Sequence, residues 1–211
     1  MGIRILFIGF IINLCSFSIE SRPISYTGGT TVMVESGAAR NNTYIHYSPS
    51  HKMSIGLDLT KDKIDRTKYA NARITYLLNR RNTKHSQRNL YVQAGVSSKG
   101  LDNYFLGVNG DWETRRVFGG FWYRYTRTDK YALNERSVQW GIAPYIGDYG
   151  DLHTWIMVKI KNDNKKNFLI SDSTMSNWDA YPMLKLFKGP VLFEVGYSKE
   201  SNINMHFMYR F

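Results

Sequence analysis

Hydrophobic and polar residues alternate along the chain with a period of two from about residue 30 to the C-terminus. In the clearest stretch, the last one, the apolar face consists of Ile203, Met205, Phe207, Tyr209 and Phe211. The opposite, mainly polar face consists of Asn202, Asn204, His206 and Arg210. This alternation is typical of β-strands whose two faces meet different surroundings. No segment after Tyr26 shows the periodicity of an amphipathic helix, so the fold is predicted to be all-β.

Stretches of this kind follow one another, separated by turn-forming or charged segments. We predict about twelve strands, near residues 30–36, 41–48, 52–60, 68–79, 88–97, 103–113, 116–127, 136–146, 153–161, 179–187, 190–199 and 202–211. The alternation is weakest in the first two, and ten strands remain if these do not form. No linker, repeat or low-complexity tract divides the chain, so a single domain is expected.

Residues 1–18 have the parts of a secretory signal peptide. Arg4 supplies the positive charge, and the apolar run Ile5–Ile12 is too short to span a bilayer as a helix. Small residues at Ser16 and Ser18 then provide a cleavage site. The alternative is that the apolar run forms a buried strand or helix of the fold.

Cleavage would remove Cys15, the only cysteine, and leave a mature domain of residues 19–211 without a thiol. That composition excludes a disulfide framework and a zinc-ribbon site. The mean hydropathy of −0.39 excludes a polytopic helical membrane protein, and the aromatic content of 15% argues against disorder. The net charge of +11 favours an anionic membrane surface or acidic solutes as partners, whereas export disfavours nucleic acid.

The last strand ends on Phe211 and carries Tyr209, Phe207 and Met205 at every second position before it. In this respect the chain resembles the Gram-negative outer-membrane β-barrel proteins, whose C-terminal strand carries such an assembly signal. The resemblance implies a transmembrane antiparallel β-barrel in the cell outer membrane, without a cofactor. It also implies contact with outer-membrane lipid and lipopolysaccharide, and recognition by the barrel-insertion machinery. The motif that carries this resemblance is confined to the last strand, and it does not identify a subfamily.

Elementary physics agrees with this class. In lipid every backbone polar group must pair within the protein, and a closed barrel leaves no edge unpaired. If both termini lie at one end, the longest connection, 162–178, falls at the opposite end, and the tight turns at 114–115 and 188–189 fall at the same end. Short periplasmic turns and longer outer loops are expected of outer-membrane barrels. A soluble periplasmic sandwich or lipocalin-like barrel with inward-facing rings is the alternative.

With the apolar faces turned toward lipid, the other faces would line the interior of the barrel. The basic residues expected there are Lys52, Arg73, Arg124, Lys159, Lys161, Lys185 and Arg210. The acidic residues expected there are only Asp58, Asp111 and Glu194. Rings of basic side chains attract anions, so the sequence predicts a narrow passive pore that prefers small anionic solutes if it is open. Pairing among these charges would instead fill the lumen and leave a structural barrel.

A lipid-modifying acylhydrolase is the alternative function. His46 and Ser48 lie two residues apart on one strand face, where an imidazole can take the proton of a hydroxyl. Glu35, on the preceding strand, is the candidate for orienting the imidazole. His206 and Ser201, near the last hairpin, form a second candidate pair. Nothing in the sequence identifies the donors of an oxyanion hole, and a polar, inward-facing strand histidine is the simpler explanation of His46.

The candidate metal ligands do not combine into a site. Met205 and His206 fall on opposite faces of the last strand, so they cannot share a copper(I) ion. Asp148 and Asp151 lie close together in a glycine-containing turn, but they lack the spacing of an EF-hand loop. An acidic turn that caps two strands explains them better. We therefore predict no metal site.

Two segments expected in outer loops, Lys61–Arg66 and Asn162–Lys166, carry several basic residues. Lysine and arginine side chains at the level of the lipopolysaccharide phosphates would form charge-assisted hydrogen bonds with them. The alternative is that these charges are simply solvated. The sequence does not decide between the two interpretations.

Replacing Phe211 with serine is expected to reduce outer-membrane insertion far more than replacing Arg210 with serine. The first change places a polar side chain in the lipid-facing alternation, whereas the second lies on the opposite face. The amount of heat-modifiable protein in the outer-membrane fraction measures insertion. Equal yields of the two variants would contradict a role of Phe211 in assembly.

Overall fold

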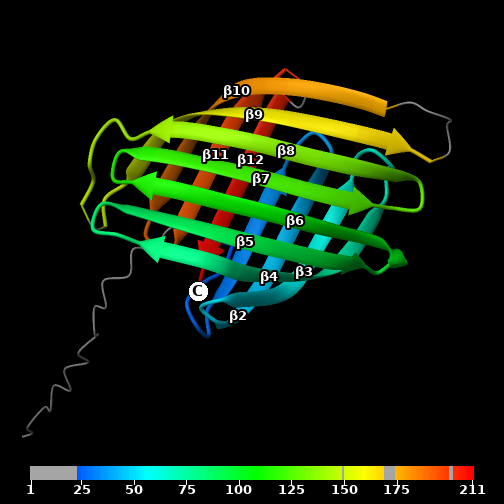
Figure 1. Ribbon diagram of the computed structural model, residues 1–211, viewed down its shortest axis with the longest axis horizontal. Coiled ribbons are helices and arrows are strands. Elements are labelled where there is room, and N and C mark those ends of the chain that lie inside the picture. The colour runs from blue at the N-terminus through cyan, green and yellow to red at the C-terminus, as the bar shows by residue number, and fades with distance from the viewer. Residues whose placement is uncertain (1–22, 149, 169–173, 200–201) are drawn as a thin grey trace, which may run out of the picture.

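The computed structural model describes residues 23–148, 150–168, 174–199 and 202–211, which form one closed antiparallel barrel (Figure 1). Its strands are β1 (Thr30–Ser36), β2 (Arg40–Ser50), β3 (Met53–Asp62), β4 (Lys68–Asn82), β5 (Ser86–Ser97), β6 (Gly100–Thr114), β7 (Val117–Arg127), β8 (Tyr131–Ile142), β9 (His153–Asn167), β10 (Thr174–Lys188), β11 (Val191–Ser198) and β12 (Asn202–Arg210). Each strand pairs with its neighbours in the chain, and β1 also pairs with β12. The predicted all-β barrel of twelve antiparallel strands is confirmed. The proposed signal peptide lies outside the described residues.

The lengths of the connections differ from the prediction in two places. The expected long loop at 162–178 is mostly strand, because β9 and β10 stay paired as far as Thr174 and Lys166. The longest connection is instead 143–152, at the end of the barrel that holds the C-terminus and the start of β1. The expected asymmetry of loops was therefore wrong. In β9 and β10 the backbone pairing continues beyond the apolar residues. The polar residues there occupy both faces, so the sequence shows no alternation from which a strand could be predicted.

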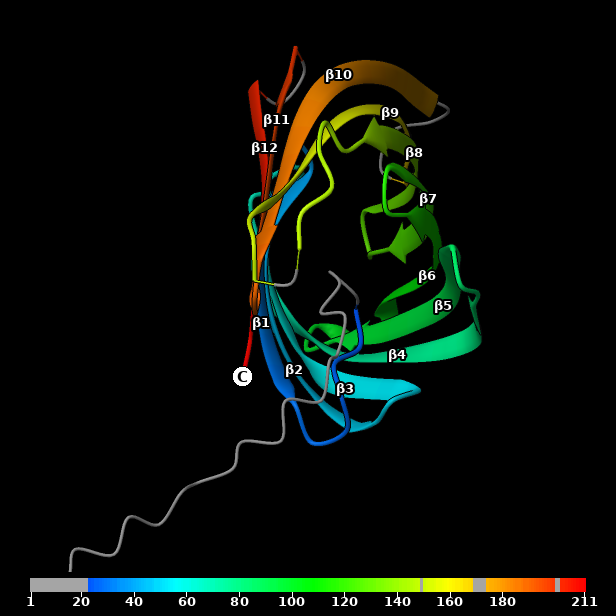
Figure 2. The same ribbon diagram turned by 90° about the vertical axis from the view of Figure 1, so that its left-hand side faces the viewer.

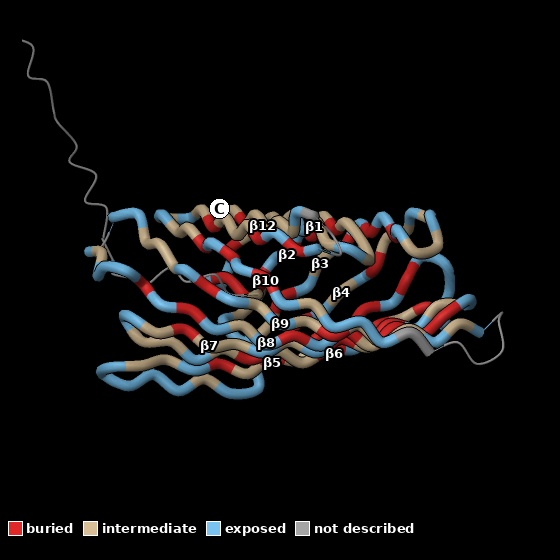
Figure 3. Tube along the Cα trace, turned by 90° about the horizontal axis from the view of Figure 1, so that it is seen from above, coloured by how far each residue is buried: buried red, intermediate tan, exposed pale blue. Residues whose placement is uncertain are grey.

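The two faces of the barrel wall differ sharply in polarity, and buried and exposed residues alternate along the strands (Figure 3). The outward side chains of Leu57, Val138 and Ile156 are more than half exposed. Inward side chains such as Asp58 and Tyr44 are almost fully buried. A soluble barrel would show the opposite arrangement, with its apolar face inside. An apolar exterior around a polar interior is the arrangement of a transmembrane β-barrel.

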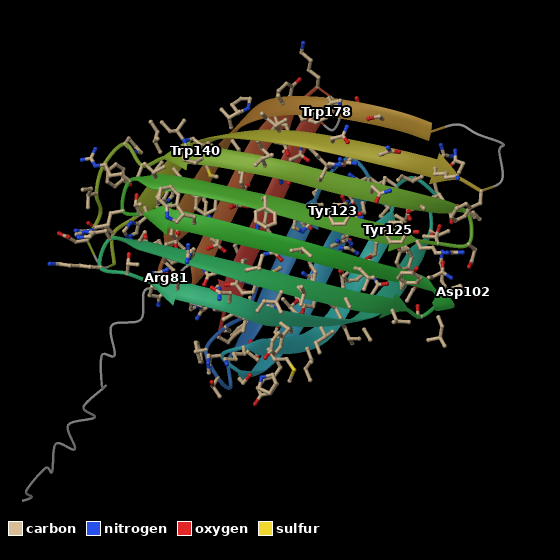
Figure 4. All side chains as sticks on the ribbon, in the orientation of Figure 1. Arg81, Asp102, Tyr123, Tyr125, Trp140 and Trp178 are labelled. Atoms are coloured by element: carbon tan, nitrogen blue, oxygen red, sulfur yellow. The ribbon has the colours of Figure 1, made fainter. Side chains whose placement is uncertain are left out.

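Outward-facing aromatic side chains gather toward both ends of this apolar surface. The end with the termini carries Tyr47, Tyr76, Trp112 and Trp140. The opposite end carries Tyr104, Tyr123, Tyr125, Trp178 and Tyr197. In Figure 4 Trp140 lies toward the end marked by Arg81, and Tyr125 toward the end marked by Asp102. Two aromatic girdles around an apolar band are typical of barrels that span a bilayer.

Among the described residues no helix is long and apolar enough to cross a membrane.

The last strand closes the barrel against the first. In β12 the side chains of Phe207 and Tyr209 share the outer face with their β1 partners Val34 and Val32. The amide of Phe211 donates to the carbonyl oxygen of Thr30 at 2.9 Å and extends this seam by one residue. The strand predicted to carry the assembly signal therefore forms one side of the closing seam.

The segment before β1 folds into the lumen at the terminal end of the barrel (Figure 2). The backbone amide of Ser25 donates to Oγ of Ser48 at 3.0 Å, and Oγ of Ser54 donates to the carbonyl of Pro23 at 3.1 Å. Ile24 is buried against Leu77 and Tyr91. The segment therefore fills part of the lumen on the side of β2 to β5.

At the opposite mouth, the connection after β3 is tied to the turn before β8. The hydroxyl of Tyr131 donates a short hydrogen bond to the carboxylate of Asp62. Nζ of Lys130 lies 2.6 Å from Oδ1 of Asp65. Since β4 to β7 separate these elements in the sheet, the contacts cross the mouth. Part of the opening is thereby covered.

Below the mouth, buried ion pairs link the same two sides of the wall. The guanidinium of Arg40 on β2 lies 2.5 Å from the carboxylate of Glu135 on β8. Asp58 on β3 lies 3.6 Å from Arg73 and 4.0 Å from Arg124 on β7. Both carboxylates are at most 3% exposed. The Arg40–Glu135 and Asp58–Arg124 pairs hold opposite walls of the lumen together, whereas Asp58–Arg73 joins the neighbouring strands β3 and β4.

Removing one partner of the Arg40–Glu135 pair is expected to destabilise the barrel more than removing exposed charge. Arg40→Ala or Glu135→Ala alone should lower the free energy of unfolding by about 2 kcal/mol, because a desolvated charge loses its partner. The double variant should lose less than the sum of the two. Reversible urea unfolding in lipid vesicles measures these values, with the exposed Arg88→Ala as control. Strict additivity would contradict the coupling.

Candidate functional site: the barrel lumen

A cavity of about 270 Å³ runs along the lumen inside the apolar band. At one end it is lined by the turn residues Gly37–Ala39, which join β1 to β2. Toward the terminal end it is lined by Glu113 and Phe118, from β6 and β7. Most of its wall comes from β8 to β12, β1 and β2, and it includes Arg40 and Glu135 of one cross-lumen ion pair. The cavity is therefore off-centre in the lumen.

One rung of the wall is a ladder of ionisable side chains on four adjacent strands. Glu35 on β1 is in register with His206 on β12, which is in register with Glu194 on β11. Nδ1 of His206 lies 2.9 Å from Oε2 of Glu194, and Nζ of Lys185 on β10 lies 3.5 Å from Oε1 of Glu194. Carboxylates thus alternate with an imidazole and an ammonium group along this rung, and Glu194 contacts both His206 and Lys185.

The wall of the cavity has no excess of basic side chains. Its five basic residues are Arg40, Arg73, Lys159, Lys161 and Lys185. Its five acidic residues are Glu35, Asp111, Glu113, Glu135 and Glu194. The prediction that only three carboxylates point inward was wrong. The predicted strands 116–127 and 136–146 leave Glu135 in the connection between them, whereas β8 begins at Tyr131 and includes it. Arg40 was missed for the same reason, at the start of β2.

The structure places most of the predicted lumen residues on the inner face. These are Arg73, Arg124, Lys159, Lys161, Lys185, Arg210, Asp58, Asp111 and Glu194. Lys52 lies instead in the exposed turn between β2 and β3. Arg124 and Asp58 do not line the cavity, because both are buried in the packed side of the lumen.

The packed side of the lumen uses its arginines as structural groups. The guanidinium of Arg124 stacks 3.7 Å from the ring centroid of Phe105, and that of Arg73 lies 4.1 Å from the centroid of Tyr44. Arg73 also donates to the side-chain oxygen of Gln93 at 2.5 Å. Cation–π contacts and hydrogen bonds of this kind fix the side chains. These two arginines therefore contribute little free charge to the passage.

The residues proposed for an acylhydrolase do not assemble into a catalytic group. His46 is 1% exposed and stacks on Tyr44, and neither of its ring nitrogens has a hydrogen-bond partner among the described residues. Oγ of Ser48 accepts the amide of Ser25 instead of facing the imidazole. Glu35 lies opposite Asn42, whereas Thr31 lies opposite His46. The second pair includes Ser201, which lies outside the described residues.

Metal coordination also finds no support in this part of the molecule. Within the described residues no group of three or more His, Cys, Asp or Glu side chains is placed to hold a metal ion. Asp148 and Asp151 bond to each other instead, since the amide of Asp148 donates to the carboxylate of Asp151 at 2.9 Å. This geometry caps a turn in the 143–152 connection.

Comparisons with known proteins find similarity only among solved structures. No protein-family model matches the chain, and no curated protein matches it. A chain described as "Unveiling the Mechanism Behind the in-meso Crystallization of Membrane Proteins" is 14% identical, with 88% of this chain and 83% of that chain covered and a TM-score of 0.48. LpxR from Salmonella typhimurium is 10% identical, with 86% and 99% covered and a TM-score of 0.40. Similarity at these values transfers no activity to this chain.

Proposed function

We propose that the chain is an outer-membrane β-barrel protein that acts as a narrow passive pore. The observation that carries this proposal is a polar cavity along the lumen of a closed barrel whose exterior is an apolar band between two aromatic girdles. Such an exterior is stable only against lipid, and such an interior only against water. The signal-like N-terminus and the C-terminal strand support a location in the outer membrane.

Several buried polar atoms have no hydrogen-bond partner among the described residues, and they support a hydrated lumen. They include Oγ1 of Thr31, the hydroxyl of Tyr44 and both ring nitrogens of His46. Buried polar groups in proteins are satisfied by water where no side chain reaches them. The passage is nevertheless narrow, because cross-lumen ion pairs and the segment around Ile24 occupy the other side. We therefore propose small conductance and selection by size.

The balance of charges argues for weak charge selectivity. The anion preference expected from the sequence depended on an excess of basic side chains, and the cavity wall carries five residues of each sign. Glu194 is neutralised by Lys185 and also hydrogen-bonds His206, and Glu135 is neutralised by Arg40. Fields from opposite charges on one wall cancel along the passage. We propose that small neutral and zwitterionic solutes pass as readily as anions.

Neutralising two acidic groups of the ladder should make the pore anion-selective. In planar bilayers under a potassium chloride gradient, the unmodified protein should give a reversal potential close to zero. Glu35→Gln combined with Glu194→Gln should shift it toward the chloride potential, because the basic side chains then predominate. Lys159→Gln should shift it in the opposite direction. Strong selectivity of the unmodified protein would contradict the charge balance, and absence of any current would contradict the pore.

Shortening Ile24 should widen the terminal end of the lumen. Ile24→Ala removes part of the side chain packed against Leu77 and Tyr91, so single-channel conductance should rise several-fold. Ile55→Ala is the matched control, because it makes the same change on the lipid-facing side of β3. An equal effect of the two variants on conductance would contradict a constriction at residues 23–25.

A further inference from the structure

We propose that the outer face of β7 to β10 binds the phosphorylated headgroup of a lipid in the outer leaflet. The site is defined by Arg127, Arg136 and Lys166, here called the outer basic patch, and it rests on the proposed location in the membrane. All three side chains are exposed and belong to the end of the barrel away from the termini. From the sequence, Lys166 is expected in an outer loop at the level of the lipopolysaccharide phosphates. The structure places it in β9 instead and adds Arg127 and Arg136, which the sequence did not single out.

The register of the strands places two of these residues, Arg127 and Lys166, on one rung. Arg127 on β7 and Lys166 on β9 are both in register with Ala132 on β8, so they flank one small residue on the same rung. Arg136 lies four residues further along β8, where it faces outward like its neighbour Val138. Adjacent strands are about 4.8 Å apart, so the long side chains of Arg127 and Lys166 can reach one ligand above Ala132.

The patch carries positive charge without compensation. None of the three side chains forms an ion pair within the part of the chain that the structure describes, whereas the inward Lys161 and Lys185 are both paired. The outward positions of β7 to β10 include no described aspartate or glutamate. A cluster of basic residues that no carboxylate neutralises attracts an anion.

The surroundings of the patch fit a headgroup rather than a free ion. The rung that holds Arg136 also carries Tyr123, Asn162 and Trp178, whose side chain is 70% exposed. The next apolar positions along β8 and β9, Val138 and Ile160, belong to the lipid-facing band. A lipid docked here would place its phosphates against the guanidinium groups and its acyl chains along the band.

A free phosphate would gain only part of this interaction. The patch is an open face on which exposed ion pairs are screened by water and salt, and each contributes little by itself. A lipid also buries its acyl chains against the barrel. Because it is confined to the plane of the membrane, its local concentration at the patch is high. The same chemistry therefore favours the lipid over inorganic phosphate, and we commit to the lipid as the occupant.

Native mass spectrometry of the protein released from vesicles tests the proposal. The probes are phosphatidylcholine vesicles that contain bis-phosphorylated lipid A or the same lipid A after enzymatic dephosphorylation. The unmodified protein should retain the phosphorylated form, and Arg127→Gln, Arg136→Gln and Lys166→Gln together should reduce retention about tenfold, as expected when several charge-assisted hydrogen bonds are lost. Retention of the dephosphorylated form should be low and the same in both proteins.

The control variant neutralises three exposed arginines at the opposite end: Arg81→Gln, Arg88→Gln and Arg116→Gln. It should retain phosphorylated lipid A within about twofold of the unmodified protein. Equal loss in both triple variants, or complete competition by inorganic phosphate, would overturn the lipid site. Heat-modifiability of every variant reports insertion separately. Failure of the unmodified protein to insert would contradict the membrane location, whereas normal insertion without retention would contradict only the outer basic patch.

Discussion

Closure of the sheet is the constraint on which the rest of this structure depends. A strand exposed to lipid cannot leave backbone groups unpaired, so the first strand must find the last. β1 is short, with seven residues, and it is in register with β12 over six of them. The inner and outer faces of all other strands follow from this one pairing, because a shift by one residue would exchange lipid-facing and lumen-facing side chains.

Inside the closed wall, charge is used mainly to hold the lumen together. Arg40, Arg73 and Arg124 each contact a buried carboxylate, and these contacts cross or pack one side of the interior. The basic character of the chain therefore says little about the field in the passage. The ladder from Glu35 through His206 and Glu194 to Lys185 places two carboxylates and one ammonium group on neighbouring strands. On the outer face, by contrast, Arg127, Arg136 and Lys166 form no ion pair within the described part of the chain.

The alternation of residues was enough to predict the barrel and the number of its strands. It works because lipid and water impose opposite demands on successive side chains, as in the stretch from Ile203 to Phe211. It failed where both faces of a strand are polar, as in β9 beyond Ile160, and where a strand begins in a charged segment, as at Glu135. The lumen was less predictable than the wall. Which carboxylate meets which guanidinium across the interior depends on closure and register, and no local pattern near Arg40 or Asp58 contains that information.

The contact between the two ends of the described chain has a consequence for biogenesis. The hydroxyl of Tyr26 donates to the carbonyl oxygen of Phe211, and the amide of Phe211 donates to Thr30. These bonds join residues separated by almost the whole given sequence, so they form only when β1 and β12 have come together. A chain that lacks β12 would leave β1 and β11 as two open sheet edges. The pairing that closes the barrel is thus also the one of longest range in the chain, and long-range pairings are slow to form.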